Sequence, residues 1–262
     1  MTAMPPEIRQ SRAAGIAPTP LSAETRERLL QCGTANIANA LLRRGLRNVS
    51  LQGLKPVRAN TRMCGPAYTL RFIPAREDLD SMERYAQDDN LHRGAMELCP
   101  AGAVLVIDAF DSLKASSAGD VMALRLKVRG GAGIVTSGGF RDVPGMIDVG
   151  LPAYQRQGAQ IATPVHMHPL ELNRPIGCAG VAVYPGDIIA GDDDGVVCIP
   201  SHLAFEVAAD ALAAEEYEAY ALWHLRRGSP LWGLFPASAQ SRKNYEAWAA
   251  AGRPPLETWS AP

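Results

Sequence analysis

The amino-acid sequence predicts an α/β fold, and three observations carry that prediction. Short continuous apolar runs, of which AVLVIDA at 103–109 is the clearest, are typical of strands buried on both faces. Segments with apolar residues at helical spacing lie between these runs as far as about residue 200. The chain has 262 residues, of which 47% are hydrophobic and 20% charged, so it is long enough to bury a sizeable core.

Three segments follow from this pattern. Residues 1–21 are rich in Pro and Ala and are expected to form an N-terminal arm, either lying on a neighbouring molecule or disordered. Residues 22–200 are expected to form one α/β core, since no internal repeat or low-complexity linker divides them. Residues 201–262 combine a long helical pattern with scattered aromatic residues, which predicts a C-terminal helical extension.

Two helices are expected at the start of the core. Ser22 begins the first, and the segment TANIANALLRRG gives the second, with Thr34 as its N-cap and Gly45 as its stop. The run AYTLRFI then has the β-branched and aromatic content of a strand. The acidic stretch 77–89 is expected to lead into a helix before the strand at 103–109.

Further β structure is expected in the second half of the core. Strands are predicted at 160–163 and 176–184, and the turn PGD with the run DDDGVVCIP predicts a hairpin-like pair within 185–200. Ser201 is then the expected N-cap of a long helix that runs through Arg227.

Candidate functional residues gather in the stretch 116–146, SSAGDVMALRLKVRGGAGIVTSGGFRDVPGM. It predicts a polar turn, a helix over Val121–Arg129, a glycine break, a strand over Ala132–Thr136 and a second glycine turn that ends in Arg141 and Asp142. Because the helix and strand return the chain about one βα unit later, Arg141 is expected beside the start of the helix.

Asp120 stands where that helix begins. The backbone N–H groups of Val121 and Met122 are expected to be unpaired donors that point out of the helix N-terminus, which suits a carboxylate. On position alone, Asp120 is more typical of a helix cap, and Arg141 with Asp142 of an exposed turn pair. Their joint spacing favours a functional role, in which one anion site, one arginine and two carboxylates converge.

Two other polar groups have competing interpretations. The run Asp192–Asp194 resembles a set of cation ligands, but consecutive residues of a β-turn point in different directions, which favours a turn. His166 and His168 could face one side of an extended stretch as ligands, but no third ligand is marked and prolines lie on either side. The glycine pairs of the central stretch form neither GxGxxG nor a P-loop and do not support nucleotide binding.

Charge and cysteine usage exclude several classes. The net charge is −1, which gives no electrostatic case for nucleic acid or an anionic membrane as partner. The five cysteines are scattered without CxxC spacing, which favours reduced thiols over a disulfide framework or a zinc site. No run nears 18 consecutive apolar residues and the first 20 residues hold no apolar signal region, so a soluble, unexported, cytoplasmic protein is expected.

Three motifs together resemble a known family. They are the pattern G-D-x20-R-D at Gly119-Asp120 and Arg141-Asp142, the preceding strand AVLVID, and the later run VYPGDIIAGDDDGVVCIP. They are similar to the family that groups the 4-hydroxy-4-methyl-2-oxoglutarate and 4-carboxy-4-hydroxy-2-oxoadipate aldolases with the regulator of ribonuclease activity A. The resemblance runs from about Thr34 to Pro200. It implies a compact layered α-β-β-α sandwich of the swivelling β/β/α type.

The resemblance also implies roles for individual residues. Asp142 would hold a Mg²⁺ ion, or Mn²⁺ or Co²⁺ in its place, with water at most other positions, and Asp120 would order those waters. A 2-oxo acid substrate would be bound by Gly119, Val121, Met122 and Arg141, with Arg141 and Asp120 as the catalytic pair. The implied protein is a homotrimer, or a hexamer of two trimers, with its site between protomers.

The implied activity is that of a metal-dependent, class II pyruvate aldolase. Such a lyase cleaves a 4-hydroxy-2-oxo acid to pyruvate and a second carbonyl compound, and the same enolate chemistry would decarboxylate oxaloacetate. The alternative within the family is a non-catalytic protein-binding regulator of a ribonuclease, which would not need Arg141 and both carboxylates. A methyltransferase is disfavoured because the glycine-rich nucleotide loop is missing. Two departures leave the second carbonyl product open: Asn39 stands where the family commonly has an acidic residue, and the extension beyond residue 200 is long.

Overall fold

The computed structural model describes residues 20–257 and residue 259. The expected arm, except for its last two residues, lies outside the described part of the chain. The helices are α1 (Ala23–Gln31), α2 (Thr34–Arg43), α3 (Met82–Tyr85), α4 (Leu91–Leu98), α5 (Asp120–Val128), α6 (Val143–Val149), α7 (Ala204–Arg226) and α8 (Ala239–Ala250). The strands are β1 (Ser50–Leu51), β2 (Lys55–Pro56), β3 (Met63–Pro74), β4 (Val104–Asp108), β5 (Gly133–Thr136), β6 (Gly139–Phe140), β7 (Ala153–Gln155), β8 (Gln157–Gly158), β9 (Met167–Leu172), β10 (Ile176–Cys178), β11 (Val181–Val183), β12 (Ile188–Gly191) and β13 (Val196–Ile199).

A curled, mixed sheet forms the centre of the molecule, as the α/β prediction requires. Its nine strands follow the path β1-β13-β12-β3-β4-β5-β7-β2, with β9 also paired to β3. The four strands β3, β4, β5 and β7 are parallel neighbours. Every residue of β4 is buried, which explains why this strand appears in the sequence as an unbroken apolar run. The fold class predicted from the sequence is therefore confirmed.

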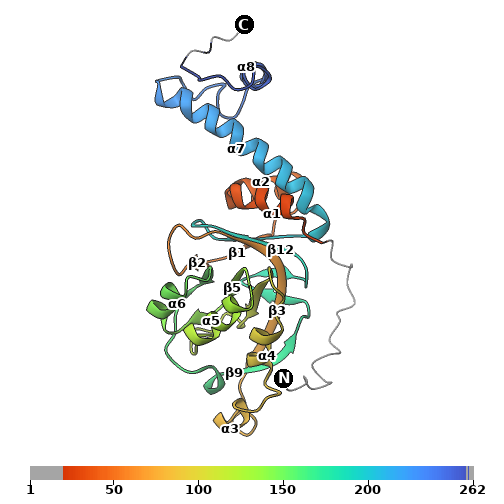
Figure 1. Cartoon of the computed structure of the whole chain (residues 1–262), viewed down its shortest axis with the longest axis vertical. Helices are drawn as coiled ribbons and strands as arrows, with labels where there is room; N and C mark the ends of the chain where they lie inside the picture. The colour runs from red at the N-terminus through yellow and green to blue at the C-terminus, as the bar shows by residue number, and fades with distance from the viewer. Residues whose placement is uncertain (1–19, 258, 260–262) are drawn as a thin grey trace.

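Helices cover the sheet on two sides (Figure 1). The helices α4, α5 and α6 pack on the parallel strands, where Leu105, Ile107, Leu126 and Ile134 are fully buried. The helices α1, α2 and the first part of α7 pack on β12 and β13 in a separate apolar cluster. The site described below lies on the α4–α5–α6 side.

The long helix α7 leaves the core partway along its length (Figure 1). Its first half buries Val207, Ala208 and Ala211 against α1 and α2. Its second half carries a small aromatic cluster in which Tyr220 packs with Tyr245 and Trp248, the last two from α8. Within the described residues, no helix is long and apolar enough to cross a bilayer.

Two of the strands expected from the sequence are wrong. Residues 160–163 form no strand and lead into a 3₁₀ turn at Thr163–Val165. The segment 176–184 is not one strand but the hairpin β10–β11, because Ala179 (φ 49°) and Gly180 (φ 81°) reverse the chain. The expected hairpin within 185–200 is confirmed as the antiparallel pair β12–β13.

Two expected helix caps also differ. The N-cap of α2 is Gly33, and Thr34 is the first helical residue, with its N–H and hydroxyl donating to the carboxylate of Asp192 at 2.8 and 2.7 Å. A 3₁₀ turn, Ser201–Leu203, precedes α7, so Ser201 does not cap that helix.

Candidate active site

Two loops that are far apart in sequence are joined by hydrogen bonds at the start of α5. The N–H of Ser117 donates to the carbonyl of Gly139 at 2.8 Å, and the N–H of Arg141 donates to the carbonyl of Ala118 at 3.0 Å. The Ser117 hydroxyl also donates to Oγ1 of Thr136 at 2.8 Å. The polar turn and the second glycine turn are therefore held together, and Arg141 lies beside the start of the helix.

Gly119 allows this close approach. A Cβ added at Gly119 would lie 2.7 Å from Oδ2 of Asp142 and 3.3 Å from Nε of Arg141. The first distance is shorter than carbon–oxygen contact permits, so a side chain at this position would displace the carboxylate. Glycine is required here for space, since its backbone is extended.

Asp142 adopts an unusual backbone conformation. Its φ of 56° and ψ of 40° place it in the left-handed region, directly before α6, and Oδ2 lies 3.2 Å from Nε of Arg141. Aspartate tolerates this region better than most residues, but it still carries strain, which is commonly found at functional sites. Both side chains of the pair are about half exposed, so the ion pair itself contributes little stability.

Asp120 is enclosed between two helix starts. Its Oδ1 accepts a hydrogen bond from the N–H of Val121 at 2.7 Å, so this amide is not the unpaired donor that the sequence suggested. On its other side the carboxylate lies against Gly145 of α6, where an added Cβ would overlap Oδ2. The amide of Met122 lies in the first turn of α5, where an N–H has no partner within the helix.

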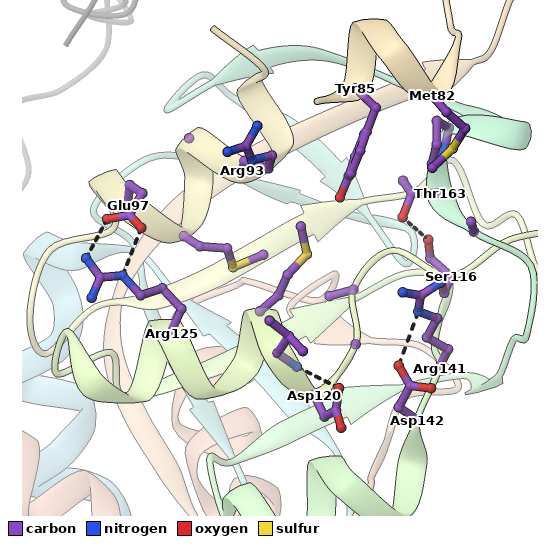
Figure 2. A pocket seen from close by; sticks show the side chains of 18 of the residues that line it. Met82, Tyr85, Arg93, Glu97, Ser116, Asp120, Arg125, Arg141, Asp142 and Thr163 are labelled. Atoms are coloured by element: carbon purple, nitrogen blue, oxygen red, sulfur yellow. Dashed lines mark hydrogen bonds and ion pairs between the residues drawn. The ribbon is translucent and has the colours of Figure 1, made fainter. Parts of the chain in front are cut away.

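All six residues predicted from the sequence line one cavity of about 890 Å³. The predicted set is Gly119, Asp120, Val121, Met122, Arg141 and Asp142. Figure 2 shows the Arg141–Asp142 pair at one end of this cavity and the Arg125–Glu97 pair at the other. Tyr85 and Met82 lie on the opposite side from Asp120, and the Tyr85 hydroxyl points into the space. The cavity is therefore bounded by charge at both ends.

Sequence reasoning missed a buried histidine behind this cavity. His92 is 1% exposed, and its Nε2 lies 2.8 Å from the carbonyl of Ser117. Because a carbonyl can only accept, Nε2 carries the proton and Nδ1 can accept from the Tyr85 hydroxyl at 3.5 Å. Burial, helped by the nearby Arg141 charge and opposed by the hydrogen bond to Ser117, lowers the pKa of His92 to about 4. The imidazole is thus neutral at pH 7 and supports the turn that precedes Asp120.

Local sequence held little sign of these contacts. Burial also raises the pKa of Tyr85, against the lowering effect of Arg141 and Arg93. Tyr85 is in the four-residue helix α3, which has no buried residue and no marked pattern.

Among the other lining groups, Thr163 donates its hydroxyl to the carbonyl of Ser116 at 2.7 Å, which ties the 3₁₀ turn to the cavity wall.

The remaining polar candidates lie away from the cavity. His168 pairs with Asp80 at 2.7 Å. Asp192 accepts hydrogen bonds from Thr34 and from the N–H of Asp194, and Asp193 accepts one from the N–H of Asn60. These side chains bond to different partners, as expected for consecutive residues of a turn. All five cysteines are buried and unbridged.

A family model described as Aldolase/RraA, RraA-like, matches residues 34–198. A protein of Halalkalibacterium halodurans named "Putative 4-hydroxy-4-methyl-2-oxoglutarate aldolase" is 35% identical over 157 residues, which are 60% of this chain and 68% of that protein. Protein DlpA of Legionella pneumophila is 27% identical over 84% of this chain, and the match spans only 33% of DlpA.

Solved structures share the fold. The crystal structure of Streptomyces coelicolor RraAS2, described as an unusual member of the RNase ES inhibitor RraA protein family, superposes with a TM-score of 0.67 at 29% identity, covering 78% of this chain and 98% of that one. An uncharacterized protein from Pseudomonas syringae pv. tomato reaches 0.75 at 23% identity, covering 89% and 99% of the two chains.

Proposed function

Because the chain belongs to the Aldolase/RraA family, we propose that it is a divalent-metal-dependent lyase that cleaves a 4-hydroxy-2-oxo acid by retro-aldol chemistry. The products would be pyruvate and a second carbonyl compound. The observation that supports this most directly is that one cavity brings together an arginine, two carboxylates and a glycine-lined helix start. Oxaloacetate would lose CO₂ at the same site, since its cleavage leaves the same enolate.

The donor groups fit a hard divalent cation. Asp120 and Asp142 line the same cavity, and each carboxylate packs directly against the backbone of a glycine, Gly145 for Asp120 and Gly119 for Asp142. Mg²⁺ keeps several waters and is often held by one or two protein carboxylates. Among the described residues, no cluster of three or more His, Cys, Asp or Glu is placed to hold a metal. We propose, as the family resemblance implies, that Asp142 would be the direct ligand of Mg²⁺, or of Mn²⁺ or Co²⁺, with water and substrate at the other positions.

When bound, such a cation supplies Lewis-acid stabilisation to the 2-oxo group. Arg141 binds the substrate through the two terminal nitrogens of its guanidinium, because its Nε faces Asp142. The amide of Met122 and the open backbone at Gly119 receive the substrate carboxylate, whereas the amide of Val121 is occupied by its hydrogen bond to Asp120.

Asp120 positions the water that takes the proton from the C4 hydroxyl. The electron pair left on the C4 oxygen then forms the second bond of the carbonyl in the departing product, and the C3–C4 bond breaks. The electron pair of that bond stays on C3, which takes a proton from water to give pyruvate. Asp120 is suited to this role because its carboxylate lines the cavity and is held from both sides.

Pyruvate release, coupled to lactate dehydrogenase, tests the proposal over a panel of 4-hydroxy-2-oxo acids. Activity should vanish with EDTA and return with excess Mg²⁺. A protein-binding regulator, the alternative suggested by the Streptomyces relative, would release no pyruvate from any substrate or metal.

We also propose that the protein is a cytoplasmic homo-oligomer, a trimer or a hexamer of two trimers, with no nucleic-acid or membrane partner. The free, buried thiols fit a reducing compartment. Exposed apolar side chains beyond α7, with Trp232 89% and Leu231 52% exposed, support an interface there.

A further inference from the structure

Helix α5 turns its larger apolar side chains to solvent. Val121, Leu124 and Val128 are 78%, 50% and 69% exposed, and their spacing of three and four residues places them on one face of the helix. The residues that α5 buries are Ala123 and Leu126. A surface helix normally packs its apolar face on the core of its own chain. The outer face of α5, defined by Val121, Leu124 and Val128, is therefore a surface for contact with another molecule.

A second apolar surface lies in the 229–238 segment, which joins α7 to α8. Its sequence, SPLWGLFPAS, contains no charged residue, and Leu231, Trp232 and Phe235 are each about half exposed or more. Figure 1 shows α7 carrying this segment away from the core, on the side of the sheet opposite α5. The segment therefore cannot cover the α5 helix of its own chain.

Charge favours a contact between these two unlike surfaces over a contact of α5 with itself. Arg125, Lys127 and Arg129 flank the outer face of α5. The carboxylate of Glu97 lies 2.8 Å from Arg125 and 3.7 Å from Arg129, so two of these cations share one anion. Two α5 helices face to face would bring an excess of cations together, which is repulsive. The uncharged 229–238 segment avoids this repulsion, and its apolar side chains match the apolar face.

A contact between two unlike surfaces also accounts for a ring. Such a contact repeats from copy to copy and closes when the rotation between copies permits. Each protomer then uses the outer face of α5 for one neighbour and the 229–238 segment for the other. Two separate self-contacts would instead pair copies about twofold axes.

The outer face of α5 borders the candidate active site. Val121 belongs both to this face and to the cavity lining. Met82, across the cavity, is an exposed lining residue as well. The rim of the cavity therefore faces solvent, and a segment seated on the outer face of α5 would lie at this rim and exclude water from the site.

We propose that the 229–238 segment of one copy packs on the outer face of α5 of the next copy and forms the missing wall of its cavity. The inference rests on the homo-oligomer and the lyase site proposed above, and it names the two surfaces that meet. The site is then shared, because one chain supplies Asp120, Arg141 and Asp142 and its neighbour supplies the wall.

Chemical cross-linking of the intact protein tests this contact. All five native cysteines are buried, so a short bismaleimide should link only cysteines introduced at exposed positions. Leu124→Cys/Trp232→Cys places one thiol on each surface. We expect this double variant to give a covalent ladder that ends at the trimer, and each single variant to stay monomeric on a denaturing gel.

The other outcomes are equally specific. A cross-linked dimer of either single variant would reveal a self-contact and overturn the inference. An oligomer whose double variant gives no ladder would overturn it too, whereas a monomeric wild type would count against the oligomer itself. The control is Tyr184→Cys/Trp232→Cys, in which Tyr184 is 51% exposed and outside both surfaces. The same ladder in this control would mean that the linkage is not specific to α5.

A variant pair tests whether the contact completes the site. Leu124 is outside the cavity lining, so Leu124→Lys keeps the proposed binding groups and sets a charge against the apolar segment of the neighbour. We expect it to sediment as smaller species and to release pyruvate at least tenfold more slowly than the wild type with Mg²⁺. The control Tyr184→Lys should keep the assembly and the rate of the wild type. An intact oligomer of Leu124→Lys, or full activity of its dissociated form, would refute the shared wall and leave the lyase function standing. Release of no pyruvate by the wild type would instead count against the lyase function.

Discussion

Nε of Arg141 lies 3.2 Å from Oδ2 of Asp142, and Asp142 holds this position from a left-handed backbone, at φ 56°. A residue forced into that region costs about 1–2 kcal/mol unless it is Gly, Asn or Asp. The identity of residue 142 is thus constrained by the backbone as well as by the proposed chemistry, and the two constraints can be separated.

Asp142→Asn separates them because asparagine tolerates the left-handed region and differs in charge. We expect its free energy of unfolding to stay within about 0.5 kcal/mol of the wild type. Pyruvate release should fall below about a tenth, because loss of the proposed metal ligand removes transition-state stabilisation. Urea unfolding and the coupled assay measure the two effects. A variant that keeps more activity than this would rule out Asp142 as the metal ligand.

Arg141→Lys should be severely impaired. Among the described residues, the ion pairs of Arg141 are limited to its Nε contact with Asp142, so its terminal nitrogens remain for an oxygen pair. A lysine ammonium cannot hold two oxygens in that planar arrangement. Loss of such a charge-assisted contact, about 1.5–3 kcal/mol, predicts a fall in kcat/KM of roughly 10- to 100-fold. Arg76→Lys, in an exposed pair with Asp78, is the control. Near-normal kinetics in Arg141→Lys would mean that the arginine is structural.

These residues could be predicted because their signals are local. Between Asp120 and Arg141 the sequence shows one helix, a glycine break and one apolar strand. A helix followed by an antiparallel strand returns the chain to its starting end, so this spacing predicts that the two residues lie close together. His92 and Tyr85 could not be predicted in this way, since the contact of His92 with Ser117 spans 25 residues and depends on how α4 packs.

The errors in the fold have equally specific causes. Ala179 and Gly180 break the segment 176–184 into a hairpin, although alanine rarely marks a turn. Strand β9 was not predicted because its sequence, MHPLEL, contains a proline and lacks apolar alternation. Its place comes from pairing with β3, a long-range contact that carries no local pattern.

Gly145→Ala should lower activity although alanine favours helices. An added Cβ would overlap Oδ2 of Asp120 and lie 3.0 Å from its Cγ, so the carboxylate must move. We expect at least a tenfold fall in kcat. A Gly→Ala substitution inside a helix normally raises the free energy of unfolding by about 0.5–1 kcal/mol, and we expect a smaller increase here. For the stability measurement, Gly94→Ala in α4 is the control, since its Cβ would meet Leu172 at an ordinary 3.8 Å. Full activity in Gly145→Ala would show that the position of Asp120 is unimportant.

His92 predicts a specific loss of stability in acid. Its pKa is about 4 in the folded protein, below its usual 6.5, because burial disfavours the charged form. Between pH 6.5 and 4 the unfolded chain therefore protonates this imidazole, whereas the folded protein keeps it neutral. The contribution of His92 to the free energy of unfolding is thus fully present above pH 6.5 and is lost as the pH falls towards 4. At 1.36 kcal/mol per pKa unit, the loss between pH 7.5 and 4.5 is on the order of 2–3 kcal/mol. Urea unfolding at both pH values should show a loss smaller by about this amount in His92→Gln, whose amide stays neutral. Equal losses in the two proteins would contradict a neutral, buried imidazole.

The proposed assembly places exposed apolar side chains beyond α7 against a neighbour. Trp232 is 89% exposed and Leu231 52% exposed, which is costly for a surface that meets only water. A closed ring of three copies would bury such a patch on every protomer. Analytical ultracentrifugation at micromolar concentration should therefore show a trimer or hexamer. The variant Leu231→Ser/Trp232→Ser should shift it towards smaller species without unfolding it, because neither side chain supports the core of its own chain. An active monomer in the wild type would refute both the interface and a site shared between protomers. A double variant that remains a trimer would show that the predicted oligomer is correct but that its interface does not include this patch.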